Sequence, residues 1–269
     1  MRGVFAILGL LVSAVPALAE APLKRLTLRQ DILGWEAVGR VEMGEKGEKG
    51  YCTGVLIAPD LVLTAAHCLY GGGEAYIRPD TMRFRAGLSD GVALAESAVA
   101  RMVVHPGYDP ASRDMEVAIR HDLGLIELAT PVPLTTAAPF AVAGLARDAR
   151  DLSVVSYGRG RDDALSWDDA CRVQGHARGL IAFDCDVTFG SSGAPVFHRI
   201  GNRAAIVSLV SMGDKIGGET LAFGMELPQA VAELKAALRR GEGAAPGQSK
   251  AQGADTRMRA GGGAKFISP

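Results

Sequence analysis

Three short segments contain residue types that can together perform nucleophilic catalysis. In chain order they read LTAAHC at 63–68, HDLGLI at 121–126 and GSSGAP at 190–195. They supply His67, Asp122 and Ser192. A serine hydroxyl is a good nucleophile only when a base removes its proton, and a neutral imidazole does this near pH 7. Because a buried carboxylate holds the imidazole in the required tautomer, these residues predict hydrolysis by a Ser-His-Asp triad.

Two neighbouring residues compete for these roles. Asp109 follows a His-Pro-Gly-Tyr turn and is more simply a turn residue than the partner of the histidine. Ser191 competes with Ser192, but the spacing to Gly193 and to the following proline favours Ser192.

An esterase of the α/β-hydrolase type would need Gly-x-Ser-x-Gly, and the last position here is Ala194. The order His, Asp, Ser also differs from the order in that fold.

A family resemblance follows from these segments. TAAHC at 64–68, DLGLI at 122–126, GxSGxP at 190–195 and VSMG at 210–213 resemble the signature segments of trypsin/chymotrypsin-like serine proteases. The ordered match spans about residues 38–240. The resemblance implies an all-β fold of two six-stranded antiparallel β-barrels packed face to face, with a cleft between them and a C-terminal helix. It also implies that His67 is the general base, that Asp122 orients it and that Ser192 attacks the scissile carbonyl.

The resemblance implies further site residues. The backbone N–H groups of Gly190 and Ser192 would form the oxyanion hole. Ser211 and Gly213 match the strand that aligns the substrate. Asp186 lies six residues before Ser192, where trypsin has the pocket-floor carboxylate that binds Arg or Lys. No histidine occurs at 205–225, so the sequence gives little support for a preference for Glu.

Two departures from the family concern activation. Animal members have Asp immediately before the nucleophile, and it pairs with a new N-terminal amine after proteolytic activation. Ser191 stands at that position here, and EAVG at 36–39 replaces the usual Ile-Val-Gly-Gly. We therefore expect no activation through such an ion pair. The segment 185–193 looks more like secreted bacterial members, including the glutamyl endopeptidase branch.

The rest of the chain reads as the strands that must position these residues. From Val38 onward, short apolar runs alternate with turn-forming clusters, which is typical of a β-barrel or sandwich. Val231, Leu234 and Leu238 predict a helix over 229–240. We expect a lead-in at 20–34, a protease domain at 35–240 with barrels at about 35–130 and 150–227, and a disordered Gly/Ala-rich tail at 242–269. The predicted strands are 38–41, 53–57, 61–64, 82–86, 98–104, 123–128, 152–157, 180–184, 194–197, 204–211 and 221–225.

The N-terminus reads as an export signal. Arg2 precedes a short apolar run, and Ala17-Leu18-Ala19 is a small-x-small cleavage site, so residues 1–19 are predicted to be a signal peptide. The alternative is an uncleaved anchor, but the apolar run is shorter than the roughly 20 residues that a spanning helix needs. No later segment is long and apolar enough to span a membrane. We expect an exported protein in the periplasm or the extracellular space.

An oxidising compartment makes the four cysteines candidates for disulfides. Four cysteines allow three pairings, and the simplest joins Cys52 to Cys68 and Cys171 to Cys185, one bond in each half. Cys52 and Cys68 also stand where the family has the disulfide beside the catalytic histidine. The sequence contains neither CxxC nor HExxH, so we expect no metal and no cofactor.

Composition narrows the partner classes. The chain has 48% apolar and 22% charged residues and a net charge of −1, which is ordinary for a folded protein. There is no basic excess for binding nucleic acid. We expect a monomeric serine endopeptidase that cleaves a polypeptide substrate through an acyl-enzyme. The alternative is a catalytically silent, protease-like binding module, although such proteins usually lose a triad residue and this chain retains all three.

Overall fold

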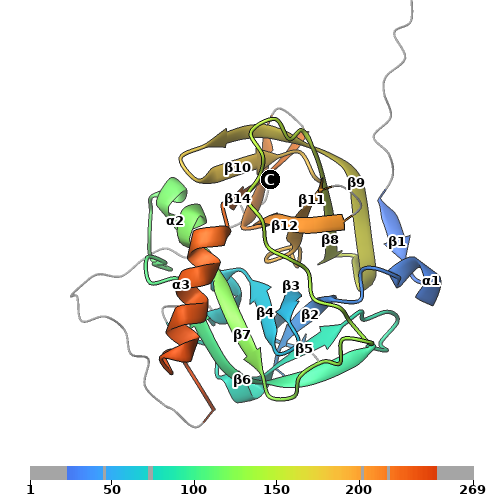
Figure 1. Ribbon diagram of the computed structural model, residues 1–269, viewed down its shortest axis with the longest axis vertical. Helices are drawn as coiled ribbons and strands as arrows, with labels where there is room; N and C mark the ends of the chain where they lie inside the picture. The colour runs from blue at the N-terminus through green and yellow to red at the C-terminus, as the bar shows by residue number, and fades with distance from the viewer. Residues whose placement is uncertain (1–22, 45–46, 72–74, 201–202, 217–218, 247–269) are drawn as a thin grey trace, which may run out of the picture.

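A computed structural model describes residues 23–44, 47–71, 75–200, 203–216 and 219–246. The expected signal peptide at 1–19 lies outside the described residues. The described chain is mostly β and divides into two halves that lie one above the other in Figure 1. None of the helices in the described part is long and apolar enough to cross a membrane.

The N-terminal half is a closed barrel of six antiparallel strands, in the order β2-β3-β4-β7-β6-β5. Each strand corresponds to one of the apolar runs that predicted a strand in this half. Alternate side chains such as Val41, Phe84 and Met102 point inward and are fully buried. The strands are β2 (Val38–Met43), β3 (Gly50–Ala58), β4 (Leu61–Thr64), β5 (Met82–Ala86), β6 (Ala95–Val104) and β7 (Gly124–Leu128).

The C-terminal half is an eight-stranded sheet instead of the expected six strands. Its main path runs β12-β11-β8-β9-β10-β14-β13. The additional members include β1 (Lys24–Leu26), which pairs with β9, and the largely exposed β13. The other strands of this half are β8 (Asp151–Gly158), β9 (Arg161–Ala177), β10 (Leu180–Phe183), β11 (Pro195–Ile200), β12 (Arg203–Leu209), β13 (Met212–Ile216) and β14 (Glu219–Met225).

The C-terminal helix is α3 (Pro228–Arg239), one residue earlier at each end than the predicted 229–240. It buries Val231 and Leu234 and packs against β6 and β7 of the barrel (Figure 1). Two further helices, α1 (Arg29–Ile32) and α2 (Met115–His121), were not predicted. They are four and seven residues long, too short to show a helical apolar period. Two short 3₁₀ turns, η2 (Ala66–Leu69) and η3 (Pro79–Thr81), complete the fold.

Both ends of the predicted domain continue into further described structure. The described part of the lead-in expected at 20–34 forms β1 and α1. After α3, within the segment expected to be a tail, Ala244 pairs with Met102 of β6 through two hydrogen bonds of 2.9 Å. These hydrogen bonds hold the segment after α3 against the barrel. Residues 247–269 lie outside the described residues.

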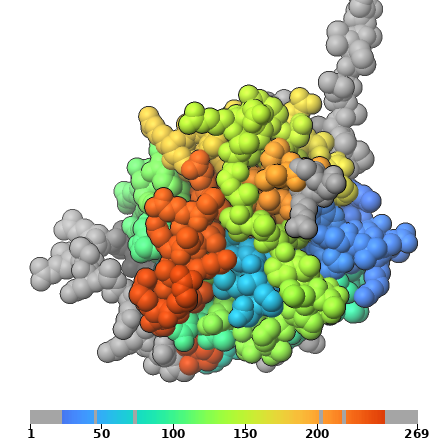
Figure 2. Space-filling model, viewed as in Figure 1, coloured from blue at the N-terminus to red at the C-terminus, as the bar shows by residue number. Residues whose placement is uncertain are grey.

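The two halves share one hydrophobic core, which fixes their relative position. It combines Leu63 and Leu123 of the barrel with Phe197 and Met225 of the sheet. The connecting segment 129–150 crosses the face beside α3 (Figure 2). It is hydrogen-bonded to both halves: Phe140 N–H donates to Leu56 O at 2.9 Å, and Ala143 N–H donates to Ile206 O at 2.9 Å. Groups on facing loops of the two halves can therefore act together without a large rearrangement.

Candidate active site

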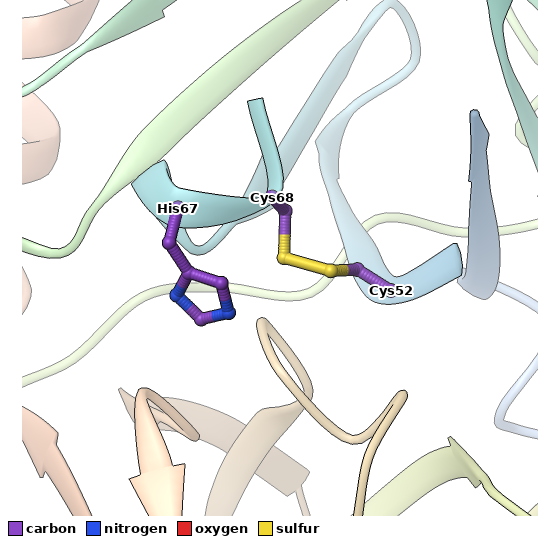
Figure 3. A group of neighbouring side chains, drawn as sticks. All are labelled: Cys52, His67 and Cys68. Atoms are coloured by element: carbon purple, nitrogen blue, oxygen red, sulfur yellow. A yellow bond between two sulfur atoms is a disulfide. The ribbon is translucent and has the colours of Figure 1, made fainter. Parts of the chain in front are cut away.

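His67 lies in the short turn η2, immediately after the barrel strand β4. Ala65 and Ala66 are fully buried, which fixes the turn against the barrel. Cys68 forms a disulfide with Cys52 of β3, as predicted. Figure 3 shows this bond beside His67, whose ring points toward the loops of the C-terminal half. The histidine is therefore held at the edge of the barrel and faces the other half.

Asp122 follows α2 and is buried, with an exposed fraction of 3%. The His67 backbone N–H donates to Oδ1 at 2.8 Å, and His67 Nδ1 bonds to Oδ2 at 2.7 Å. The carboxylate accepts at Oδ2, so the hydrogen belongs on Nδ1 and Nε2 is left as the proton acceptor. Ser211 also donates from its hydroxyl to Oδ2, at 2.6 Å. The carboxylate thus orients the imidazole as a general base requires.

The environment of His67 changes its basicity. Burial alone lowers the pKa of the imidazole, but the charge of Asp122 and the hydrogen bond to it raise that pKa above its ordinary value. A higher pKa makes the neutral imidazole a stronger proton acceptor. It also makes the imidazolium that forms during proton transfer more stable.

Ser192 lies on the tight turn before β11 and is nearly buried, with an exposed fraction of 5%. Its carbonyl accepts a hydrogen bond from Thr53 N–H of the barrel at 2.9 Å. The next residue, Gly193, has φ +75° and donates to Val210 O at 2.7 Å. A Cβ at Gly193 would lie 2.2 Å from Thr64 Oγ1, so only glycine fits between the turn and the end of β4. This contact holds the predicted nucleophile against the segment that leads to His67.

Thr53 connects the nucleophile loop to the barrel through its side chain as well. Its hydroxyl donates to Gly190 O at 2.8 Å and accepts from Tyr157 N–H at 3.0 Å. Its own carbonyl accepts from Thr64 Oγ1 at 2.8 Å. Thr53 is fully buried, so each of these bonds is shielded from water. Sequence reasoning missed this residue, because a threonine next to a cysteine in an apolar run carries no spacing signal.

Gly190, predicted to form the oxyanion hole, has φ +94° and lies against the edge of the Tyr51 ring. A Cβ at this position would lie 2.3 Å from the ring. Because L-residues rarely adopt this backbone conformation and the ring leaves no room, the position requires glycine. Tyr51 and Thr53 are two residues apart on β3, on one face of the strand, so the barrel contacts the Gly190–Ser192 loop at both positions.

Ser191 replaces the aspartate expected in animal relatives and is fully buried. Its hydroxyl lies 3.1 Å from Ser156 Oγ and 3.4 Å from Tyr157 O, and it accepts from Thr188 N–H at 3.3 Å. These are neutral hydrogen bonds made within the C-terminal half. The loop is thus held by local hydroxyl contacts at the place where an aspartate would need a cationic partner.

Asp186 is not the buried pocket-floor carboxylate that counting back from Ser192 predicted. Its side chain is 60% exposed, and its carboxylate lies 4.0 Å from Arg161. Val187 is the residue that faces the predicted substrate-aligning strand: a Cβ at Gly213 would lie 2.6 Å from Val187 Cγ2. The position of Asp186 relative to Ser192 matches the family, but the loop turns the carboxylate toward solvent.

The second predicted disulfide, between Cys171 and Cys185, is also present. It joins β9 to the loop that leads to Asp186 and onward to Ser192. Each half therefore has one disulfide close to its candidate catalytic segment. In the two groups that combine cysteines with a nearby His or Asp, all the cysteines are in these disulfides, and metals bind free thiolates.

Comparisons with known proteins agree with this geometry. A family model described as a trypsin-like peptidase domain matches residues 52–206. Brachyurin from Leptuca pugilator is 31% identical over 144 residues, which cover 52% of this chain and 58% of brachyurin. A trypsin from Phaedon cochleariae is 36% identical over 85 residues, 31% of this chain and 30% of that trypsin. The chain thus spans less than two thirds of the length of these relatives.

Solved structures support the fold. A Glu endopeptidase has a TM-score of 0.66 at 17% identity, covering 82% of this chain and 98% of that one. The protease Anisep from Arthrobacter nicotinovorans has a TM-score of 0.58 at 16% identity, covering 74% of this chain and 93% of that one. At these identities the likeness concerns the fold alone. Together with the family match, which covers more than half of the sequence, it establishes that this chain belongs to the trypsin-like peptidase domain family.

Proposed function

We propose that this protein is an exported serine endopeptidase that cleaves peptide bonds through an acyl-enzyme on Ser192. The observation that carries the proposal is the hydrogen-bond chain from Ser211 through Asp122 to His67 Nδ1, at 2.6 and 2.7 Å. It leaves His67 Nε2 as a proton acceptor facing the loops of the C-terminal half. Ser192 lies on such a loop, anchored to the same barrel by Thr53.

The chemistry proceeds in two half-reactions. Ser192 Oγ attacks the scissile carbonyl carbon while its proton passes to His67 Nε2, and the carbonyl oxygen becomes an oxyanion. The backbone N–H groups of Gly190 and Ser192 would stabilise this oxyanion. His67 then gives the proton to the leaving nitrogen, and the C–N bond breaks to leave an ester on Ser192. Water, deprotonated by His67, attacks this ester and releases the second product.

Export is supported by the cysteines. Both cysteine pairs form disulfides, and disulfides persist in oxidising compartments. The Ser191 hydroxyl contacts also support activity without a cationic N-terminal partner for this loop. Removal of the signal peptide would then be the only processing step needed.

The test is labelling of the purified, exported protein with a fluorophosphonate, read by intact mass and peptide mapping. A single adduct on Ser192 that is absent from Ser192→Ala is expected. Ser191→Ala is the matched control for the site of labelling: it loosens the loop and should slow the reaction, but the adduct should still form on Ser192. If correctly oxidised, folded protein formed no adduct, the endopeptidase proposal would be wrong. A protease-like binding module would then be the better description.

A further inference from the structure

The side of the site that receives the leaving group can be identified from the proposed chemistry. His67 must protonate the leaving nitrogen, so that part of the substrate passes close to His67. Cys68 follows His67, and its disulfide to Cys52 lies beside the His67 ring (Figure 3). Tyr51 precedes Cys52 on β3, and the edge of its ring contacts Gly190. The Ser211–Gly213 segment, expected to align the acyl part, makes different contacts: Ser211 is hydrogen-bonded to Asp122, and Gly213 faces Val187.

Tyr51 and Phe189 both lie next to Gly190 on this leaving-group side, and Arg159 lies over the Phe189 ring. Tyr51 packs on Gly190, and Phe189 is the residue immediately before Gly190. Arg159, at the turn between β8 and β9, places its guanidinium 3.9 Å from the centroid of the Phe189 ring. Its backbone N–H also donates to Phe189 O at 2.7 Å. We call these three residues the leaving-group wall.

The arginines near the leaving-group wall differ in whether they are paired with an acidic side chain. Arg40 lies over the Tyr51 ring at 5.2 Å but donates to Glu42 at 2.8 Å and to Asp162 O at 3.0 Å. Arg161 donates to Asp186 O at 3.1 Å and has the Asp186 carboxylate at 4.0 Å.

Arg159 is different from both of these arginines. It is exposed, and among the residues that the structure describes it forms no ion pair. A guanidinium stacked by its face on an aromatic ring keeps the N–H groups at its edge free for a carboxylate.

We propose that Arg159 binds a carboxylate on the leaving-group side, so that the enzyme prefers Asp or Glu within two residues after the scissile bond. The inference rests on the proposed endopeptidase function. An extended peptide advances about 3.3 Å per residue, and a side chain in either of the first two positions lies within reach of an arginine beside Gly190. Phe189 fixes the guanidinium in place, so less side-chain entropy is lost when the carboxylate binds.

The first experiment maps cleavage sites in a random-sequence peptide library by mass spectrometry. It compares wild type, Arg159→Gln and Arg159→Glu, with Arg239→Gln as the matched control. Arg239 is an exposed arginine at the end of α3, on another part of the molecule (Figure 1). Enrichment of Asp and Glu at the first or second position after the cut is expected for wild type and Arg239→Gln. Arg159→Gln should lose the enrichment, and Arg159→Glu should prefer Lys or Arg there.

The second experiment measures kcat/KM on peptide pairs that differ only by Asp or Asn at the preferred position. We expect about a threefold to tenfold preference for Asp in wild type, as for an accessible charge-assisted pair, and none in Arg159→Gln. The preference should shrink as salt is raised, because exposed charges are screened. Equal rates on the Asp and Asn peptides in wild type, or a preference unchanged by Arg159→Gln, would overturn the inference.

Fluorophosphonate labelling of Ser192 in every sample separates the two ways to fail. Full labelling together with cleavage that ignores Asp would reject the role of Arg159 and leave the endopeptidase proposal intact. Absence of labelling in folded wild type would reject both. Retained labelling in Arg159→Glu, combined with reversed charge preference, would be the strongest support, because a misfolded variant would lose the adduct as well.

Discussion

The two halves hold their proposed catalytic segments in different ways. In the barrel, His67 bonds to Asp122 through both its backbone N–H and its ring, so base and carboxylate are joined within one half. The nucleophile loop of the C-terminal half is held partly from outside. Ser191 bonds to Ser156 within its own half, whereas Thr53 of the barrel bonds to Gly190 and Ser192.

Because of this difference, substitutions in the two halves should affect different properties of the enzyme. Damage to the His67–Asp122 pair should change acid–base chemistry, because the pair sets the protonation of the imidazole. Damage to the interface between the halves should change the nucleophile loop, because Thr53 reaches across it. The barrel thus carries the proposed base and also anchors the loop of the other half.

Asp122→Asn should reduce kcat by about 10⁴, because the amide favours the wrong tautomer of His67. In wild type, kcat/KM should fall as the pH drops through the raised pKa of His67, since protonated imidazole cannot accept the Ser192 proton. Removing the negative charge lowers that pKa, so the acid limb of Asp122→Asn should move to lower pH. The pH–rate profiles of both proteins measure this. Coinciding acid limbs would show that Asp122 does not set the basicity of His67.

Removing either disulfide should lower the free energy of unfolding by about 3 kcal/mol, because the two close loops of similar length, with separations of 16 and 14 residues. Denaturant unfolding of the double Cys→Ser variants at each pair measures it. The two variants should differ in activity at permissive temperature. Loss of Cys52–Cys68 frees the turn that carries His67, whereas loss of Cys171–Cys185 frees the loop before Asp186. If the variant without Cys52–Cys68 lost less kcat than the variant without Cys171–Cys185, the Cys52–Cys68 bond would not be what holds His67 in place.

The barrel was the easier half to predict, for a physical reason. Its strands bury alternate side chains, as in Met82–Ala86, so each one appears as a short apolar run between turns. The 17-residue β9 was missed because most of its side chains are only partly buried or exposed, and its sequence lacks an apolar period. β13 was missed for the same reason, with no buried side chain in Met212–Ile216. Hydrogen bonds to neighbouring strands, which leave no mark in the sequence, define both.

The candidate site also contains residues that the sequence could predict and residues that it could not. His67, Asp122, Gly190, Ser192 and Ser211 could be predicted as site residues because their motifs specify residue type and spacing. Thr53 was missed because its role depends on contacts between segments far apart in the sequence. The side-chain orientation of Asp186 could not be read from a count of residues, because it depends on how the loop turns. Motifs therefore predicted the chemical groups, and the structure supplied the contacts that hold them.

Thr53→Val should lower kcat/KM by about tenfold to a hundredfold, because it leaves Gly190 O and Tyr157 N–H without their buried hydroxyl partner. The loss should lie in kcat, since the loop would hold the oxyanion donors less firmly. Thr53→Ser retains the hydroxyl and should recover most of the rate. Ser208→Ala is the control, because its buried hydroxyl donates to Met225 O at 2.9 Å within the C-terminal half. If kcat/KM of Thr53→Val equalled that of Ser208→Ala, the Thr53 hydroxyl would not be needed to hold the nucleophile loop against the barrel.

The smallest expected effect concerns Asp186, where the motif count and the structure differ. If its carboxylate were the pocket floor, Asp186→Asn would abolish a preference for Arg or Lys before the scissile bond, because a buried carboxylate selects cationic side chains. In the structure it is exposed beside Arg161, and such surface pairs contribute only about 0–1 kcal/mol. We therefore expect Asp186→Asn to change kcat/KM on peptides with Lys, Ala or Glu before the scissile bond by less than about fivefold.

Val187→Ala should change the ranking of these peptides more, since Val187 faces Gly213. A selective loss of Lys cleavage in Asp186→Asn would mean that the loop turns the carboxylate inward when substrate binds, and that the C-terminal half is remodelled by its substrate whereas the barrel is not.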